Sequence, residues 1–542
     1  MKYPIGIQNF PKVRQDGYAY VDKTAFIYKL ASEGSYYFLS RPRRFGKSLL
    51  ISTMDAYFRG WKELFHGLAL ETLEKDWTVY PVVHIDLNTG KYDSEDALFH
   101  VLNDYLCKLE DVYGKYPSEV TPELRFKGII ERIAKKHNQR VVILVDEYDK
   151  PMLQAIDNPE LQEHFRNTLK AFYSVLKTQD QYIKFAFLTG VTKFGKVSVF
   201  SDLNNLVDIS MDARYQGICG ITQDELMTYF KSSVQDFADA YGISLDEAAA
   251  KLKKRYDGYH FRQRGVDIYN PFSLLNTFAT GELGSYWFET GTPSFLVQLL
   301  KRDNYYLPNL TEEEVSGDFL NSVDSVDVSP VPILYQSGYL TIKDYDQRFQ
   351  TYTLGFPNEE VSEGFTEYLL PYYTNMEKNA SPMFVGQFVH DMEKGKPEAF
   401  MKRMAVLFAD TDYKIVGDAE LYFQNAFYLI TKLLGFYTEV EHTISDGRID
   451  MIAKTKDYIY IFEFKYDRNA DAALRQIDEK GYAAPFAADP RKLGLILPGF
   501  LCYHGIYHCK LKRSGRYNDN CFVYANHICG HADTDFPVGT QS

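Results

Sequence analysis

The segment YYFLSRPRRFGKSLLISTMDAYF, residues 36–58, contains the pattern that decides the fold of the N-terminal part of the chain. Its apolar start, Tyr36–Leu39, predicts a short strand, and Ser48–Phe58 predicts a helix. A loop of Arg, Pro and Gly joins the two. Backbone N–H groups at such a junction, together with the helix dipole, bind phosphate groups. We therefore predict a phosphate-binding loop at residues 40–48.

This loop follows most of the P-loop (Walker A) pattern GxxxxGK[ST], so that Arg44, Gly46, Lys47 and Ser48 are candidate nucleotide-binding residues. In that pattern the Lys47 ammonium reaches the outer phosphates and the Ser48 hydroxyl ligates Mg²⁺. The first Gly of the pattern is absent, and Arg41 stands in its place. Because GKS is common by chance, an ordinary basic helix start is the alternative.

A second element of the same kind is the apolar strand Val141–Val145, which ends in Asp146 and Glu147. This arrangement indicates a Walker B strand, in which Asp146 holds Mg²⁺ through water and Glu147 polarises the attacking water of ATP hydrolysis. The alternative is a buried strand with a solvated acidic end. Thr189 follows another apolar strand and is a candidate sensor of the γ-phosphate, although such a hydroxyl can equally satisfy backbone groups.

Three further cations are candidates for contacting nucleotide across a subunit boundary of a homo-oligomer: Lys193, Lys196 and Arg214. A solvated surface charge is the alternative for each.

Alternation of strands and helices organises the N-terminal part of the chain. Apolar strands at Val82–Leu87 and Phe185–Leu188 are separated by helical stretches, which is typical of an α/β domain with a largely parallel sheet. We place this domain at residues 1–215.

The middle of the chain, residues 216–375, is predicted to be helical, with Thr222 and Glu225 forming a capping box at its start. Tyr335–Ile342 and Gln350–Leu354 alternate like a small hairpin, which would give a winged-helix-like domain.

A third domain is expected at residues 376–500, followed by an atypical tail at residues 501–542. In the third domain a helix from Asp418 leads into a β-rich section. Four of the six cysteines lie in the last 41 residues, but no zinc-type spacing occurs there, so an irregular tail is expected.

The formal charge of −13 over 542 residues argues against a surface that attracts nucleic acid or anionic membranes as a whole. A polyanion would need a local basic groove, and residues 251–264 are a candidate, with a solvated helix end as the alternative. No apolar run approaches the ~18 residues that span a bilayer, and the first ten residues are not typical of a secretory signal. We expect a cytoplasmic protein without a membrane partner.

A second candidate site lies in residues 447–465, which read as a hairpin. With a tip within residues 454–457, Asp450 faces Ile461, and Asp450 and Glu463 are diagonal neighbours on one face, ~7 Å apart. Alternation adds Lys465 to that face. Two carboxylates can hold a divalent ion that activates water against a phosphodiester, with Lys465 stabilising the developing charge. A Glu463 to Lys465 pair on an exposed strand face is the alternative.

Two residues outside the hairpin are further candidates for this site. Glu420 opens the preceding helix and is a possible extra carboxylate ligand or an ordinary helix N-terminal acid. Gln476 shares a helix face with Lys480 and would orient the site or contact phosphate.

Eleven short motifs resemble a known architecture, an AAA-ATPase-like domain joined to a C-terminal nuclease-like domain of the PD-(D/E)XK superfamily. They are YPIGIQNF, YVDKT, SRPRRFGKSLL, VDEYDKP, LTGVTKF, FSDLNNL, YDGYHF, NPFS, GRIDM, IFEFK and RQIDEKGYA. The resemblance covers residues 3 to about 485 and implies a C-terminal domain of the restriction-endonuclease-like α/β fold. It departs after Lys492, where a strand and a short aromatic-rich ending are expected. A replaced terminus would leave the nuclease sheet without its last strand.

The resemblance implies that Lys47, Ser48, Asp146 and Glu147 handle ATP and Mg²⁺, and that Asp450, Glu463 and Lys465 form a metal nuclease site. The leading hypothesis is an ATPase that controls a metal-dependent nuclease acting on DNA. A nucleotide-dependent switch whose C-terminal domain binds DNA or protein without cutting is the alternative. A plain ATPase with a decayed terminal domain is a third reading.

Overall fold

The computed structural model describes residues 1–193, 199–200, 203–263, 265–289, 294–311, 313–321, 329–374, 381–408, 419–435, 439–445, 448–463, 490–501, 510–512 and 521–529. The chain forms two compact units. Unit 1 contains residues 1–303 and 309–362, and unit 2 contains residues 304–308 and 363–542. Each unit is described by itself.

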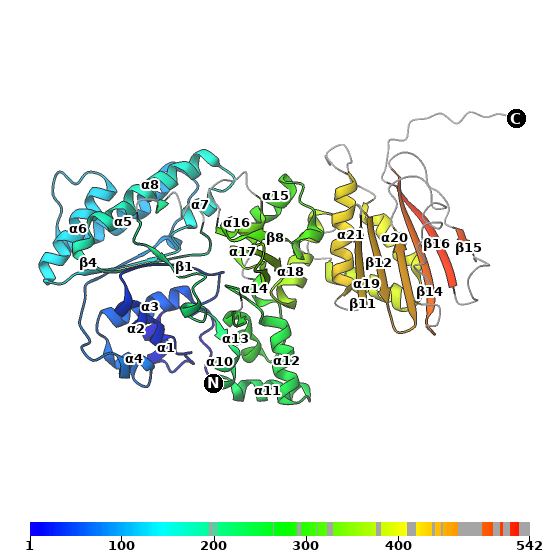
Figure 1. The fold of residues 1–542 in the computed structure, drawn as a ribbon, viewed down its shortest axis with the longest axis horizontal. Helices are drawn as coiled ribbons and strands as arrows, with labels where there is room; N and C mark the ends of the chain where they lie inside the picture. Colours follow the sequence, from blue (N-terminus) through cyan, green and yellow to red (C-terminus); the bar gives the residue numbers. More distant parts are fainter. Residues whose placement is uncertain are drawn as a thin grey trace. The chain divides into compact units, whose positions relative to one another are not determined.

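A five-stranded parallel sheet forms the centre of unit 1 (Figure 1). Its strands are β1 (Tyr36–Ser40), β2 (Val82–Asp86), β3 (Val141–Asp146), β4 (Ile183–Gly190) and β5 (Val207–Asp208), in the order β2-β3-β4-β1-β5. Every residue of β1 and β3 is buried, as apolar strands covered on both faces should be. The predicted α/β layer with its parallel sheet is confirmed.

Helices cover both faces of this sheet (Figure 1). On one side lie α5 (Glu95–Tyr113), α6 (Pro122–His137) and α8 (Pro159–Thr178). On the other lie α1 (Phe10–Gln15), α2 (Thr24–Glu33), α3 (Lys47–Phe58) and α4 (Ala69–Leu73). Because the strands are parallel, all their carboxyl ends meet at one edge, and the predicted phosphate loop and acidic pair both follow strand ends there.

The helical part of unit 1 contains α10 (Gln223–Tyr229), α11 (Lys231–Tyr241), α12 (Leu245–Tyr256) and α13 (Pro271–Thr280). They bury a shared apolar cluster that includes Leu226, Val234 and Leu252. The Thr222 and Glu225 capping box is present, and the Glu225 carboxylate also accepts from the Lys23 ammonium at 2.5 Å. This partly buried pair ties the start of α10 to the segment before α2.

The predicted hairpin near residue 340 forms, but its first strand starts later than the sequence suggested. Residues Val331–Ser337 are helix α17, which Gly338 ends in the left-handed conformation with φ of 90°. Strand β10 (Thr351–Gly355) then pairs with β9 (Thr341–Asp346) on one side and with β8 (Glu314–Ser316) on the other, in a three-stranded sheet. The prediction of a strand from Tyr335 was therefore wrong, because Tyr335 lies within a helix that a glycine ends.

Unit 2 combines helices with a six-stranded mixed sheet. The helices include α19 (Ser381–Glu393), α20 (Pro397–Phe408) and α21 (Ala419–Gly435). The strands are β11 (Glu439–Ser445), β12 (Arg448–Lys454), β13 (Tyr458–Glu463), β14 (Lys492–Leu501), β15 (Lys510–Lys512) and β16 (Cys521–Cys529), in the order β11-β12-β13-β14-β16-β15. Helix α21 confirms the helix expected from Asp418, and its apolar residues from Ala426 to Leu434 are buried.

The pairing of β12 with β13 differs by two residues from the predicted register. Asp450 lies directly opposite Glu463, not opposite Ile461. The reason lies at the tip, where Thr455 closes the turn. Its N–H donates to the carbonyl oxygen of Tyr458, and its hydroxyl oxygen accepts from the N–H of Tyr458, which leaves only residues 456–457 to reverse the chain. A shift of two keeps residues on the same face, so the prediction that the two acids share a face survives the correction.

The tail also differs from expectation. Strand β14 parallels β13, and β16, from within the tail, parallels β14. The expectation of an irregular tail is therefore wrong for residues 510–512 and 521–529, which extend the sheet. No helix within the described part of the chain combines the length and apolarity that a membrane span requires.

Candidate functional site: a nucleotide-sized cavity and an acidic strand pair

The phosphate loop lies between β1 and α3, as predicted. Gly46 adopts φ of 94° and Arg44 adopts φ of 68°, left-handed conformations that turn the chain into the helix. The first N–H groups of α3 have no partner within the helix and carry its positive dipole end. The loop therefore presents donors suited to an anion.

Lys47 is buried at the base of this loop. Its ammonium donates to the carbonyl oxygens of Arg41 at 3.1 Å and Pro42 at 3.3 Å, and it pairs with Glu147 Oε1 at 3.3 Å. The structure thus brings the predicted P-loop lysine and the predicted catalytic acid into direct contact.

Arg41, which stands where the pattern has its first Gly, has a structural role. Its side chain is buried, and its Nη1 donates to the carbonyl oxygens of Ser40 at 2.9 Å and Ser210 at 2.7 Å. The guanidinium lies 4.0 Å from the centre of the Phe261 ring. Arg41 therefore stabilises the loop from within the core.

The helical part of unit 1 also holds the loop, which sequence reasoning missed. Trp287 Nε1 donates to the carbonyl oxygen of Arg43 at 3.1 Å, and the N–H of Gly220 donates to that of Phe45 at 3.1 Å. The Phe45 ring packs edge-on against Tyr259, with centroids 4.8 Å apart. No local sequence pattern predicts these contacts, because they join residues that lie about 170 to 240 positions apart.

The acidic pair sits where β3 ends. Asp146 is buried, and its Oδ1 accepts from the Thr189 hydroxyl at 2.5 Å and from the N–H of Glu147 at 3.1 Å. Glu147 adopts φ of 54°, an uncommon conformation for a residue with a side chain. Burial raises the pKa of the Glu147 carboxyl, while the Lys47 ammonium opposes that rise. Thr189 thus bonds to the predicted Mg²⁺ ligand.

Asp149 is a positioning residue that sequence reasoning missed. Its fully buried carboxylate accepts from the N–H groups of Val191 at 3.2 Å and Thr192 at 2.6 Å, and from the Thr192 hydroxyl at 2.7 Å. These bonds fix the turn after β3 to the chain after β4. Burial raises the pKa of the Asp149 carboxyl, while the Thr192 hydrogen bonds favour its charged form.

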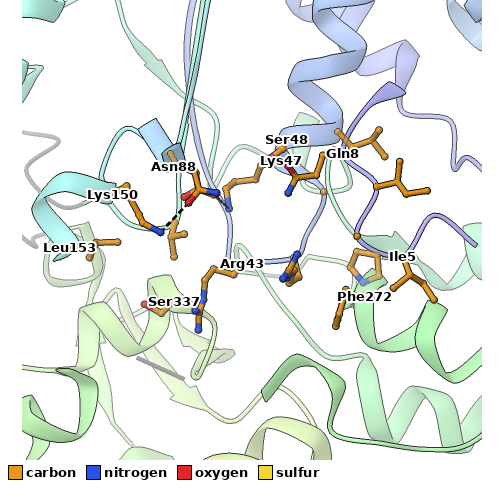
Figure 2. A pocket seen from close by; sticks show the side chains of 18 of the residues that line it. Ile5, Gln8, Arg43, Lys47, Ser48, Asn88, Lys150, Leu153, Phe272 and Ser337 are labelled. Carbon is orange, nitrogen blue, oxygen red and sulfur yellow. Dashed lines mark hydrogen bonds and ion pairs between the residues drawn. The ribbon is translucent and has the colours of Figure 1, made fainter. Parts of the chain in front are cut away.

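A cavity of about 810 Å³ opens at Lys47, Ser48 and Glu147 (Figure 2). Arg43, Arg44, Lys47 and Lys150 line it, against two carboxylates, those of Glu147 and Asp157. Its volume lies within the range of about 300–1,000 Å³ typical of small-molecule sites. Positive charge in excess of negative charge suits a phosphate chain.

Other lining residues are apolar. The N-terminal segment contributes Ile5 and Ile7, and α13 contributes Phe272 and Leu275. The carboxamide oxygen of Asn270 accepts from the N–H of Phe272 at 2.9 Å and so starts α13 beside the cavity. An apolar wall of this kind suits the flat face of a nucleotide base.

The second candidate site lies on the sheet of unit 2. Asp450 and Glu463 are directly opposite each other in neighbouring strands. Glu420 lies in the first turn of α21. Lys465, Gln476 and Lys480 lie outside the described residues.

Comparison with known proteins agrees with the two domain types that the sequence motifs resemble. Residues 4–200 match the family described as predicted AAA-ATPases, and residues 418–500 match the PD-(D/E)XK nuclease superfamily. An uncharacterized protein in the vnfD 5' region of Azotobacter chroococcum is 36% identical over 508 residues, which cover 91% of this chain and 95% of that protein. The chain belongs to the AAA-ATPase-like family. Its C-terminal domain belongs to the PD-(D/E)XK nuclease superfamily.

In this AAA-ATPase-like protein, two of the three cations considered for contact across a subunit boundary already have acidic partners. The Lys193 ammonium pairs with Asp208 at 2.9 Å. Arg214 pairs with Asp212 at 2.7 Å and Glu33 at 3.4 Å. Lys196 lies outside the described residues.

Two of the four cations of α12 also have acidic partners. Lys254 pairs with Glu359 at 2.6 Å, and Lys253 lies 3.6 Å from Asp267. Arg255 donates to the Ser285 hydroxyl at 2.9 Å. These partners favour the solvated helix end over a groove for a phosphate backbone.

Proposed function

We propose that this AAA-ATPase-like protein binds and hydrolyses ATP with Mg²⁺ in the cavity of unit 1, and that its C-terminal domain is a divalent-metal nuclease acting on DNA. The observation that carries the first part is the convergence of Lys47, Ser48 and Glu147 on one nucleotide-sized cavity. The superfamily match of residues 418–500 supports the second part.

Ser48, which lines the cavity, and Asp146, which precedes the lining residue Glu147, fit Mg²⁺. The Ser48 hydroxyl has no hydrogen-bond partner among the described residues. Asp146 uses only Oδ1 in the hydrogen bonds to its described neighbours, which leaves Oδ2 for a metal-bound water. Hydroxyl and carboxylate oxygens are the ligands that Mg²⁺ prefers, and the bound ion would neutralise phosphate charge.

The ion pair between Lys47 and Glu147 indicates an order for phosphate binding and water activation at the site. A phosphate chain entering the cavity competes with Glu147 for the Lys47 ammonium. Glu147, released from that partner, orients water and accepts its proton. Burial raises the pKa of this carboxyl, which makes it a better base than an exposed glutamate.

The nuclease proposal relies on the strand register of unit 2. Asp450 and Glu463 would hold a divalent ion that activates water against a phosphodiester. We propose that Lys465, Glu420 and Gln476 complete this site.

Replacing Lys47 with alanine tests nucleotide binding. We expect the affinity for a fluorescent ATP analogue to fall about 100-fold, because two charge-assisted phosphate contacts are worth about 3 kcal/mol. Lys108→Ala is the matched control, since Lys108 lies on the surface and pairs with Asp104 of its own helix. If Lys47→Ala binds as tightly as the wild type, the cavity is not the nucleotide site.

Replacing Phe272 with alanine tests the apolar wall. Loss of one aromatic contact with a base costs about 1–3 kcal/mol, so we expect about tenfold weaker binding of ATP, with similar weakening for ADP. Phe99→Ala, at an exposed phenylalanine of α5, is the control. Unchanged affinity after Phe272→Ala, measured by the same titration, would place the base elsewhere.

A further inference from the structure

Lys150 is a cation at the cavity that the proposed site has not yet used. It is the first residue of α7 (Lys150–Gln154), shortly after the acidic pair, and its N–H donates to the carbonyl oxygen of Glu147 at 3.0 Å. The neighbouring Asp149 is anchored to the end of β4. The backbone of Lys150 is therefore held at a fixed place relative to Glu147.

The Lys150 ammonium lines the cavity together with Lys47 and Ser48. Figure 2 shows its side chain directed towards Asn88, with the Lys47 side chain close by. It donates to Asn88 Oδ1 at 3.0 Å, and no ion pair of the described residues includes it. A neutral amide thus holds the ammonium in place while its charge stays available.

Other cations of the region lie elsewhere or have partners. Lys193 and Arg214 each pair with acids, and Arg44 lies 5.0 Å from the centre of the Phe272 ring. Arg43 also lines the cavity, but it belongs to the phosphate loop and not to the segment that follows Glu147. Lys47 has its role at the base of the loop. Phosphoryl transfer needs positive charge around the three outer oxygens of the transferred group, and in many ATPases a second protein cation supplies part of it.

We propose that Lys150 is this chain's own cation for the γ-phosphoryl group, so that turnover needs no residue from a second subunit. The proposal rests on ATP hydrolysis as the function of the cavity. In the reaction, a water oxygen forms a bond to the γ-phosphorus while the bond from that phosphorus to the bridging oxygen breaks. The bridging oxygen leaves on ADP with the electron pair, and Glu147 takes the proton of the water.

The test compares the full-length wild type with Lys150→Met, which keeps the length of the side chain, and with Lys150→Arg, which keeps its charge. We expect kcat of Lys150→Met to fall about 10²–10³-fold, as for loss of one stabilising group in the transition state, with ATP affinity changed less than about threefold. Lys150→Arg should recover part of that loss. Wild-type kcat per chain should not depend on chain concentration.

A second readout separates transition-state contact from structure. The wild type should retain ADP in the presence of Mg²⁺ and aluminium fluoride, which imitates the transferred group, and Lys150→Met should lose this retention while still binding ADP. Equal kcat and retention in wild type and Lys150→Met would overturn the proposal about Lys150 alone. So would a lower unfolding temperature with parallel loss of binding, since that outcome marks a structural tether to Asn88. A wild type that fails to bind ATP would instead overturn the proposed function, and the role of Lys150 with it.

Discussion

Glu147→Gln should bind ATP at least as tightly as the wild type and hydrolyse it about 10²–10⁴-fold more slowly, the range that a positioned general base contributes. The amide keeps the shape of the side chain but cannot accept a proton from water. It also carries no charge to hold Lys47, whose ammonium lies 3.3 Å from Glu147 Oε1, so phosphate binding meets less competition. Single-turnover release of phosphate and equilibrium binding of ATP measure the two effects separately.

A matched control for this variant is Glu163→Gln, because Glu163 lies on the exposed surface of α8 and pairs with Arg166 of the same helix. This control should hydrolyse ATP at the wild-type rate. If Glu147→Gln hydrolyses ATP as fast as the wild type, Glu147 is not the general base, even though it lies close to Lys47.

Asp450→Ala is expected to remove metal-dependent DNA cleavage, with a loss of about 10³-fold. A metal ion supplies several kcal/mol of charge stabilisation in the transition state, and about 4 kcal/mol corresponds to about 10³-fold in rate. Asp450 is the natural choice because it lies directly opposite Glu463 in the sheet. The measurement is cleavage of a labelled DNA with Mg²⁺ or Mn²⁺.

Asp457→Ala serves as the control for Asp450→Ala, since Asp457 lies at the tip of the same hairpin and is exposed. It should cut DNA as the wild type does. Equal cleavage by Asp450→Ala and wild type would refute the metal site. No cleavage by the wild type under any metal would favour a C-terminal domain that binds without cutting.

Short-range patterns predicted the sheet of unit 1 well. The apolar runs that became β1 and β3 are fully buried, and burial between two helical layers requires such runs. The loop before Lys47 was also predictable, because the residues of its pattern are consecutive in the sequence. Gly338 shows the limit of this reasoning, since the helix that contains Tyr335 ends at this left-handed glycine and the strand begins only after it.

Residues that meet only in three dimensions escaped prediction. Ile5 and Phe272 line the same cavity, although 267 positions separate them. Trp287 supports the loop through one hydrogen bond to Arg43, which no periodicity could reveal. The predicted register of the hairpin in unit 2 was wrong by two residues. The register depends on which residues close the turn, and Thr455 closes it.

The most direct test of the account is a crystal structure of the full chain with a non-hydrolysable ATP analogue and Mn²⁺, read through the anomalous signal of the metal. We predict Mn²⁺ beside Ser48 and Asp146, the phosphate chain at Lys47, and the Lys47 ammonium separated from Glu147. An analogue bound outside this cavity, or an intact ion pair between Lys47 and Glu147 in the occupied protein, would contradict it.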